Sequence, residues 1–191
     1  MDKKLKTIIA LVIILLIIVV PIYIKQKNSK YIDYNGFKVY KTDLNNYDIE
    51  IFFENDPSPH YISSRYNPNN LDYIKVEDNL KEKILKNKIY VTLTPELTST
   101  SVIAAVEISK ITSNQFLFNI PTKSSLTYDT GNNIIVTCTD VSSSISVITL
   151  KLSNKTQVYS KEGCIIIEGT TEDEIIEAAT KFTLSILDIT E

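Results

Sequence analysis

The longest apolar stretch of the chain, TIIALVIILLIIVVPIYI, runs from Thr7 to Ile24 and carries no charged residue over 18 positions. As a helix it would reach about 27 Å, close to the thickness of the hydrocarbon core of a bilayer. A buried core helix would show a polar face, and this stretch has none. Three lysines before it suit a cleavable signal peptide, but the residues around Pro21 are too large for signal peptidase. We therefore predict an uncleaved transmembrane anchor at residues 7–24.

The next part of the chain, residues 31–66, alternates apolar and polar side chains, as half-buried β-strands do. The segment YIDYNGFKVYK centres on Asn35 and Gly36, and Asn-Gly between alternating runs favours a tight hairpin because both turn positions need positive φ. YDIEIFFE and HYISSRY follow as further strands, separated by the turn residues NDPSP. The pattern predicts an antiparallel meander.

The period changes between residues 76 and 121. Four elements are predicted here: a short helix in VEDNLKEKILKN, a strand in KIYVTLT, a helix in STSVIAAVEISKIT and a strand in QFLFNIP. In the second helix Val102 and Val106 lead the apolar side, with Ile103 and Ala105 beside them. Strand, helix and strand in this order indicate a βαβ crossover, which is expected to be right-handed.

The C-terminal third contains short apolar runs and one strongly amphipathic segment. NNIIVTC, SVITLKL, TQVYS and CIIIEG are predicted as strands, and the continuous runs NIIV and CIII suit strands covered on both faces. Thr171 and Glu174 form a capping box at the start of a final helix. Its apolar stripe consists of Ile175, Ala178, Ala179, Phe182 and Ile186.

These elements together predict an α/β or α+β fold. The expected organisation is a basic cytoplasmic tail at 1–6, the anchor at 7–24, a stalk at 25–30 and one mixed-sheet domain with two or three helices at 31–191.

Charge bears on the side of the membrane that the domain occupies. Three lysines flank the anchor on each side, so the positive-inside rule does not decide its orientation. Residues 31–191 carry 14 basic and 22 acidic side chains, which gives no attraction to an anionic inner leaflet and argues against nucleic-acid binding. The sequon at Asn154 is a candidate glycosylation site outside the cell. We expect the N-terminus in the cytoplasm and the domain outside.

The two cysteines, Cys138 and Cys164, have two interpretations. They could be buried free thiols that act as small apolar side chains. Alternatively they form a disulfide, which requires an oxidising compartment. Because each borders an apolar strand, neighbouring positions in one sheet would bring them within bonding range, and we predict the disulfide.

The chain from YNGF to SILDI resembles a group of membrane-anchored proteins of unknown function from small-genome archaea. The resemblance rests on the N-terminal span, a cysteine before the strand VITL, a second cysteine opening CIIIEG, and a final helix with a Leu/Ile tail. One departure is Asp188, where a glycine is expected just past that helix. The resemblance implies an external, disulfide-bonded domain and no particular activity.

Candidate catalytic groups are few. His60 is the only histidine, and no nucleophile motif accompanies it; Arg65 could bind a carboxylate or phosphate, but both side chains suit ordinary surface positions. We predict no catalytic set, metal site or cofactor, since two distant cysteines and one histidine do not make a usual zinc site and no phosphate-binding glycine loop is present. Glu107 with Asp140 is the carboxylate pair that an enzyme of this sequence would use.

Tyrosine is the one abundant residue that favours contacts, with 11 in the chain. Tyr31, Tyr34, Tyr40 and Tyr47 gather in the first hairpin and just after it, where they suit either sheet packing or a partner surface. Two functions follow as hypotheses. The first is a non-enzymatic domain that binds or scaffolds another cell-envelope protein. The alternative is a membrane-tethered hydrolase or transferase that uses carboxylates.

Overall fold

The computed structural model describes residues 31–54, 56–129, 131 and 134–190. The predicted tail, anchor and stalk lie outside these residues. Within the described part of the chain, no helix combines the length and the apolar character needed to cross a bilayer.

The first sheet is the predicted antiparallel meander, with strand order β1-β2-β3-β4. Its strands are β1 (Ile32–Tyr34), β2 (Phe37–Lys41), β3 (Tyr47–Phe53) and β4 (Asp56–Ser64). Asn35 and Gly36 form the first turn with φ of 51° and 83°, as the Asn-Gly signal predicts. β4 begins earlier than expected, within the predicted turn NDPSP. Pro57 and Pro59 are tolerated there because they fall in the register shift between β4 and β3, where neither is paired with a residue of β3.

The second sheet has six strands in the order β5-β9-β10-β8-β6-β7. Its strands are β5 (Lys75–Val76), β6 (Lys88–Leu93), β7 (Thr122–Leu126), β8 (Ile145–Leu152), β9 (Gln157–Lys161) and β10 (Cys164–Gly169). Strands β10, β8, β6 and β7 are mutually parallel, whereas β9 is antiparallel to β10. The mixed α/β class is confirmed, but two sheets stand where one was predicted.

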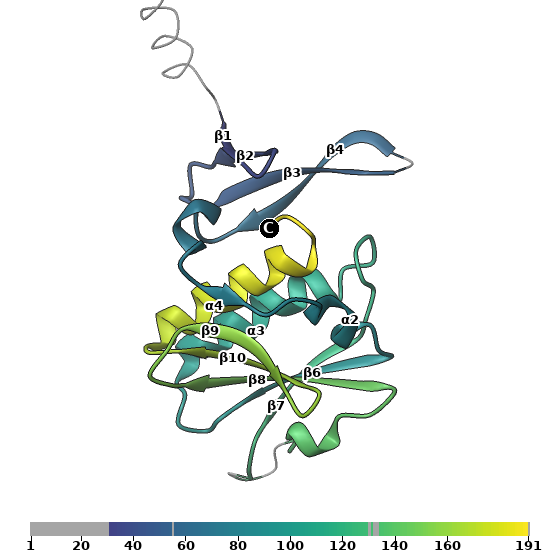
Figure 1. The fold of residues 1–191 in the computed structure, drawn as a ribbon, viewed down its shortest axis with the longest axis vertical. Coiled ribbons are helices and arrows are strands. Elements are labelled where there is room, and N and C mark those ends of the chain that lie inside the picture. The colour runs from purple at the N-terminus through teal and green to yellow at the C-terminus, as the bar shows by residue number, and fades with distance from the viewer. Residues whose placement is uncertain (1–30, 55, 130, 132–133, 191) are drawn as a thin grey trace, which may run out of the picture.

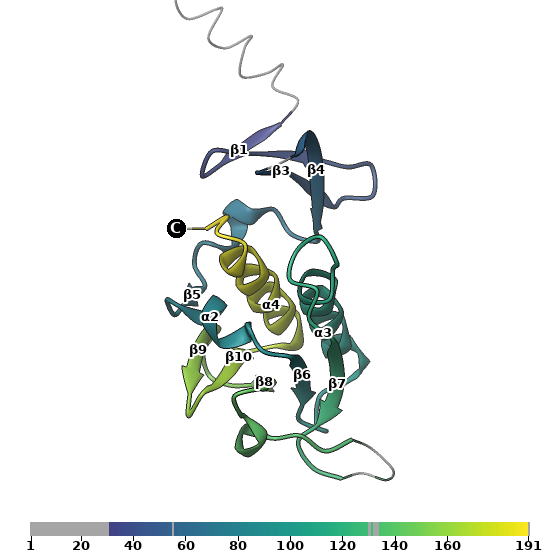
Figure 2. The same cartoon turned by 90° about the vertical axis from the view of Figure 1, so that its right-hand side faces the viewer.

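Three α-helices and two short 3-10 helices complete the described fold: α2 (Leu80–Ile84), α3 (Ser99–Thr112), α4 (Glu172–Ile186), η1 (Pro68–Leu71) and η2 (Cys138–Asp140). Figures 1 and 2 show α3 and α4 side by side on one face of the six-stranded sheet, with the meander beyond them. The core joins all three layers: Ile148 and Ile167 from the sheet, Phe182 from α4, and Val39 and Ile49 from the meander are fully buried.

The final helix is largely as predicted. Thr171 accepts a hydrogen bond from the Glu174 amide, while the Glu174 carboxylate accepts from the Thr170 amide, one residue before the expected partner. At the other end Asp188 has φ of 59°, and its amide donates to Ser185. Asp188 therefore occupies the left-handed position where a glycine is usual.

The two valines predicted to lead the buried side of α3 face outward, whereas Ala105, predicted beside them, is buried. Val102 and Val106 are 47% and 44% exposed, whereas Ala104, Ile108 and Ile111 are buried. The buried side of α3 also carries the polar residues Ser101, Glu107 and Thr112, so the spacing of its apolar residues did not identify that side.

Two predicted strands are absent from their expected positions. QFLFNIP forms turns after α3, and β7 follows it in the polar segment TKSSL. The segment before Cys138 contributes only a single bridge, between Ile135 and Leu126, and then η2. The first error has a physical cause: β7 is an edge strand, where polar residues are tolerated and an apolar run is not required.

Candidate functional site

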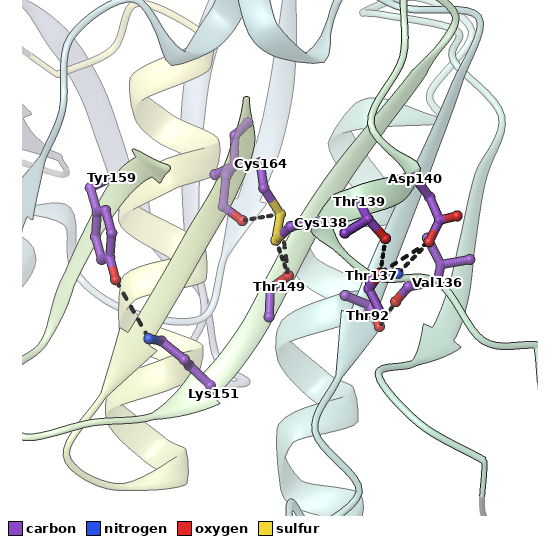
Figure 3. The surroundings of a disulfide bond; sticks show 11 residues. Thr92, Val136, Thr137, Cys138, Thr139, Asp140, Thr149, Lys151, Tyr159 and Cys164 are labelled. Atoms are coloured by element: carbon purple, nitrogen blue, oxygen red, sulfur yellow. Dashed lines mark hydrogen bonds between the residues drawn. A yellow bond between two sulfur atoms is a disulfide. The ribbon is translucent and has the colours of Figure 1, made fainter. Parts of the chain in front are cut away.

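Cys138 and Cys164 form a disulfide, as predicted, with their Cα atoms 5.2 Å apart. They are not on neighbouring strands: Cys164 opens β10, but Cys138 lies in η2. Figure 3 shows Thr149 next to the bond, with its hydroxyl 3.4 Å from each sulfur. The bond holds residues 134–144 against the face of the six-stranded sheet that carries no helix, because Cys164 and Val147 pack there with Val136.

The same face, which carries no α-helix, holds an ion pair between the buried Glu168 and the partly exposed Lys151. Glu168 is 3% exposed, lies 3.1 Å from the Lys151 ammonium and accepts a hydrogen bond from Gln157 at 2.7 Å. Burial alone would raise the pKa of Glu168, but donors from Gln157 and Lys151 outweigh it and hold that pKa below the ordinary value. Glu168 is thus an ionised, fully bonded group and not a poised acid.

The two carboxylates named as a possible enzymatic pair are on opposite faces of the six-stranded sheet. Glu107, on α3, lies 2.9 Å from the Lys110 ammonium and 3.9 Å from the Arg65 guanidinium. Asp140, on the face that carries no α-helix, accepts from the Thr137 amide at 2.7 Å and caps η2. The structure does not bring them together, and each has a structural partner.

The remaining predicted polar residues have ordinary surroundings. His60 lies 2.8 Å from the Asp56 carboxylate, and its ring centroid is 4.7 Å from that of Phe53. Asn154 is exposed in the loop between β8 and β9, so its glycosylation stays a prediction. Among the residues that the structure describes, no three His, Cys, Asp or Glu side chains converge on a position for a metal ion.

The N-terminus of α3 is filled by a carboxylate of the protein itself. Glu172 accepts from the amides of Thr98 and Ser101 at 3.1 and 3.0 Å, and from both hydroxyls. Burial would raise the pKa of Glu172, but the donors of Ser101 and Thr98 outweigh it and lower the pKa. Helix N-termini after parallel strands are common phosphate sites, and here the acceptor position is already occupied. No motif or periodicity in the sequence indicates this contact between helices.

A second polar cluster, also missed from the sequence, joins the meander to α4. Lys181 is 7% exposed, and its ammonium lies 2.7 Å from the Asp72 carboxylate and 2.9 Å from the Tyr34 hydroxyl, which also donates to Asp72. Burial would lower the pKa of Lys181, yet the bonds to Asp72 and Tyr34 raise it. The cluster lines a cleft of about 970 Å³. The sequence offered one signal for this cluster: Lys181 directly precedes Phe182, which belongs to the apolar stripe of the final helix and is buried.

Two surfaces are apolar or aromatic and uncovered. The first, here called the α3–β7 edge, comprises Val102, Val106, Leu126 and Ile134 with the outer edge of β7. A groove of about 730 Å³ runs along it. Leu126 pairs through its backbone with residues 134 and 136, but in the described residues no strand pairs with the outer edge of β7 at 122–125.

The second surface, here called the tyrosine face, is the outer side of the meander. It comprises Tyr31, Tyr40, Tyr61 and Phe52; the centroid of Tyr40 lies 6.0 Å from those of Tyr31 and Tyr61. Two of the four tyrosines predicted to cluster, Tyr31 and Tyr40, are thus on this face. The others point inward: Tyr34 is buried, and Tyr47 packs against the core.

Comparison of the chain with models of protein families, with curated proteins and with solved structures finds no match in any of the three.

Proposed function

We propose that this chain is a membrane-anchored, extracytoplasmic domain that binds or scaffolds another protein of the cell envelope. The observation that carries the proposal is the disulfide between Cys138 and Cys164, since such a bond persists in oxidising compartments and is rare in reducing ones. The uncharged stretch at 7–24 supports the anchor, and the 22 acidic against 14 basic side chains of residues 31–191 support the outer location.

The α3–β7 edge is the surface that best supports binding. Alternation along the strand directs the amide and carbonyl of Ser124 outward, so an extended segment of a partner can add to the sheet there. Val102 lines the adjoining groove and would pack against the apolar side chains of that segment. Because the domain carries more acidic than basic side chains, the complementary partner is an extended apolar segment with basic flanks.

Photo-crosslinking in native membranes tests this function. A photoreactive amino acid at Val106 should give one defined adduct with another envelope protein. The same group at Leu152, which is 48% exposed against 44% for Val106, should give none. Ser124→Pro removes the outward amide and should abolish the adduct. Equal labelling from both positions, or an adduct that survives Ser124→Pro, contradicts the proposal.

The alternative of a hydrolase or transferase has no specific observation in its favour, because Glu107 and Asp140 lie on opposite faces of the sheet.

A further inference from the structure

The meander is the part of the domain that the predicted anchor holds nearest to the bilayer. This step rests on the proposed function. The anchor is predicted to end at Ile24, and the described chain begins at Tyr31. Seven residue steps span at most about 25 Å when fully extended. The first sheet therefore stays close to the headgroup region, which occupies several ångströms beyond the hydrocarbon core.

Only the outer side of the meander is free to face the membrane. Its inner side packs on α4 through Val39 and Ile49, both fully buried. Tyr31, where the described chain begins, lies on the outer side with its ring beside that of Tyr40. The chain thus enters the domain at the tyrosine face itself.

The chemistry of the tyrosine face matches the headgroup region. Phe52, Tyr61 and Tyr31 are 58%, 54% and 41% exposed, and all come from one side of one small sheet. Tyrosine combines an apolar ring with a hydroxyl that keeps its hydrogen bonds to water and headgroups, so it concentrates at membrane interfaces.

The Glu50 carboxylate beneath these rings is already paired. Glu50 is 9% exposed, lies 2.8 Å from the Lys38 ammonium and accepts from the Tyr40 hydroxyl at 3.0 Å. The Lys38 ammonium also lies 5.8 Å from the centroid of the Tyr31 ring. The face therefore presents aromatic rings around a neutralised ion pair, and the carboxylates of Asp33 and Asp48 lie on the same side of the sheet.

We infer that the tyrosine face rests on the headgroup region of the same bilayer that holds the anchor. The domain then has a fixed orientation, with the meander against the membrane and the loop after β7, at the other end of the molecule in Figures 1 and 2, directed away from it.

Fluorescence of the full chain in phosphatidylcholine vesicles tests the inference. The chain contains no tryptophan, so one Tyr→Trp substitution gives a single reporter. Tyr61→Trp should show blue-shifted emission and lose intensity when the lipids are brominated. Tyr128→Trp, in the loop after β7 and 49% exposed, is the matched control and should keep its intensity. Adding Phe52→Asp to Tyr61→Trp should remove the blue shift and the quenching.

The outcomes separate the inference from the proposed function. If the protein floats with the vesicles but brominated lipid does not quench Tyr61→Trp, the tyrosine face does not contact the bilayer and the inference is wrong, while the anchor stands. Equal quenching of both reporters would also overturn it, since the contact would not be specific to this face. Protein that does not float, or whose N-terminus lies beyond residue 24, refutes the anchor itself.

Discussion

Helices α3 and α4 lie side by side on the same sheet, yet the sides that face away from the sheet differ. Polar side chains are buried on α4, whereas apolar side chains are exposed on α3. On α4, Thr180, Lys181 and Thr183 are buried. On α3, Val102 and Val106 are exposed. The meander explains the difference because it covers α4 as a third layer and supplies Tyr34 to Lys181. Whether a helix side meets water depends on the layers above it, and not on its polarity alone.

The largest expected effect comes from removing the largest fully buried side chain, that of Phe182 on α4. Phe182 is fully buried, so Phe182→Ala should leave a cavity and lower the free energy of unfolding by about 3–5 kcal/mol. Near-ultraviolet circular dichroism of the full chain in detergent, followed during urea unfolding, measures this change. A loss below about 1 kcal/mol would mean that α4 is packed loosely in the core.

The next effect concerns the opposite side of the sheet, where a loop held by the disulfide takes the place of a helical layer. The double variant Cys138→Ser, Cys164→Ser should lose about 3 kcal/mol, because the unfolded chain is no longer restrained across 26 residues. Its Tm should fall by roughly 6–12 °C. Reductant should lower the Tm of the natural chain similarly and leave the variant unchanged. Two reactive thiols in the unfolded, unreduced protein would place the domain in a reducing compartment.

The contrast between α3 and α4 also explains which features the sequence could predict. Asn35-Gly36, the run CIII and the stripe of α4 are local signals, and the structure confirms the turn, the fully buried strand β10 and the buried stripe. The separation into two sheets, the covering of α4 and the capping of α3 by Glu172 arise from contacts between residues far apart in the chain. No periodicity or turn motif records such contacts.

Low pH should weaken the contact of α4 with α3, and high pH should weaken the contact of α4 with the meander. Glu172 joins α4 to α3, and hydrogen bonds from Ser101 and Thr98 outweigh burial and lower its pKa. Its contribution to the free energy of unfolding is therefore present above the ordinary pKa of 4.5 and is lost as the pH falls through the pKa of the folded state. Lys181 joins α4 to the meander. Its pKa is raised by Asp72 and Tyr34 despite burial, so its contribution is present below the ordinary pKa of 10.5 and lost as pH rises through the folded value.

Urea titrations from pH 3 to 11 separate the two contacts. Glu172→Gln should reduce the slope of the acid limb of the stability curve and leave the alkaline limb unchanged. Lys181→Met should flatten the alkaline limb and also reduce the acid limb, because Lys181 lowers the pKa of Asp72. If Glu172→Gln also changes the alkaline limb, the two contacts are not independent and the assignment of that limb to the meander side of α4 is wrong.

The smallest expected effect, and the sharpest comparison, lies within α3 itself. Val106 is 44% exposed and Ile108 fully buried, so Val106→Ala should change the free energy of unfolding by less than about 0.5 kcal/mol, while Ile108→Ala should cost about 2–5 kcal/mol. Urea unfolding at two protein concentrations measures both. A loss for Val106→Ala that approaches that of Ile108→Ala would show that the outer side of α3 is covered in the purified protein. If that loss also grew with concentration, a second copy of the chain would be the cover, and the α3–β7 edge would be a self-association surface instead of a site for another envelope protein.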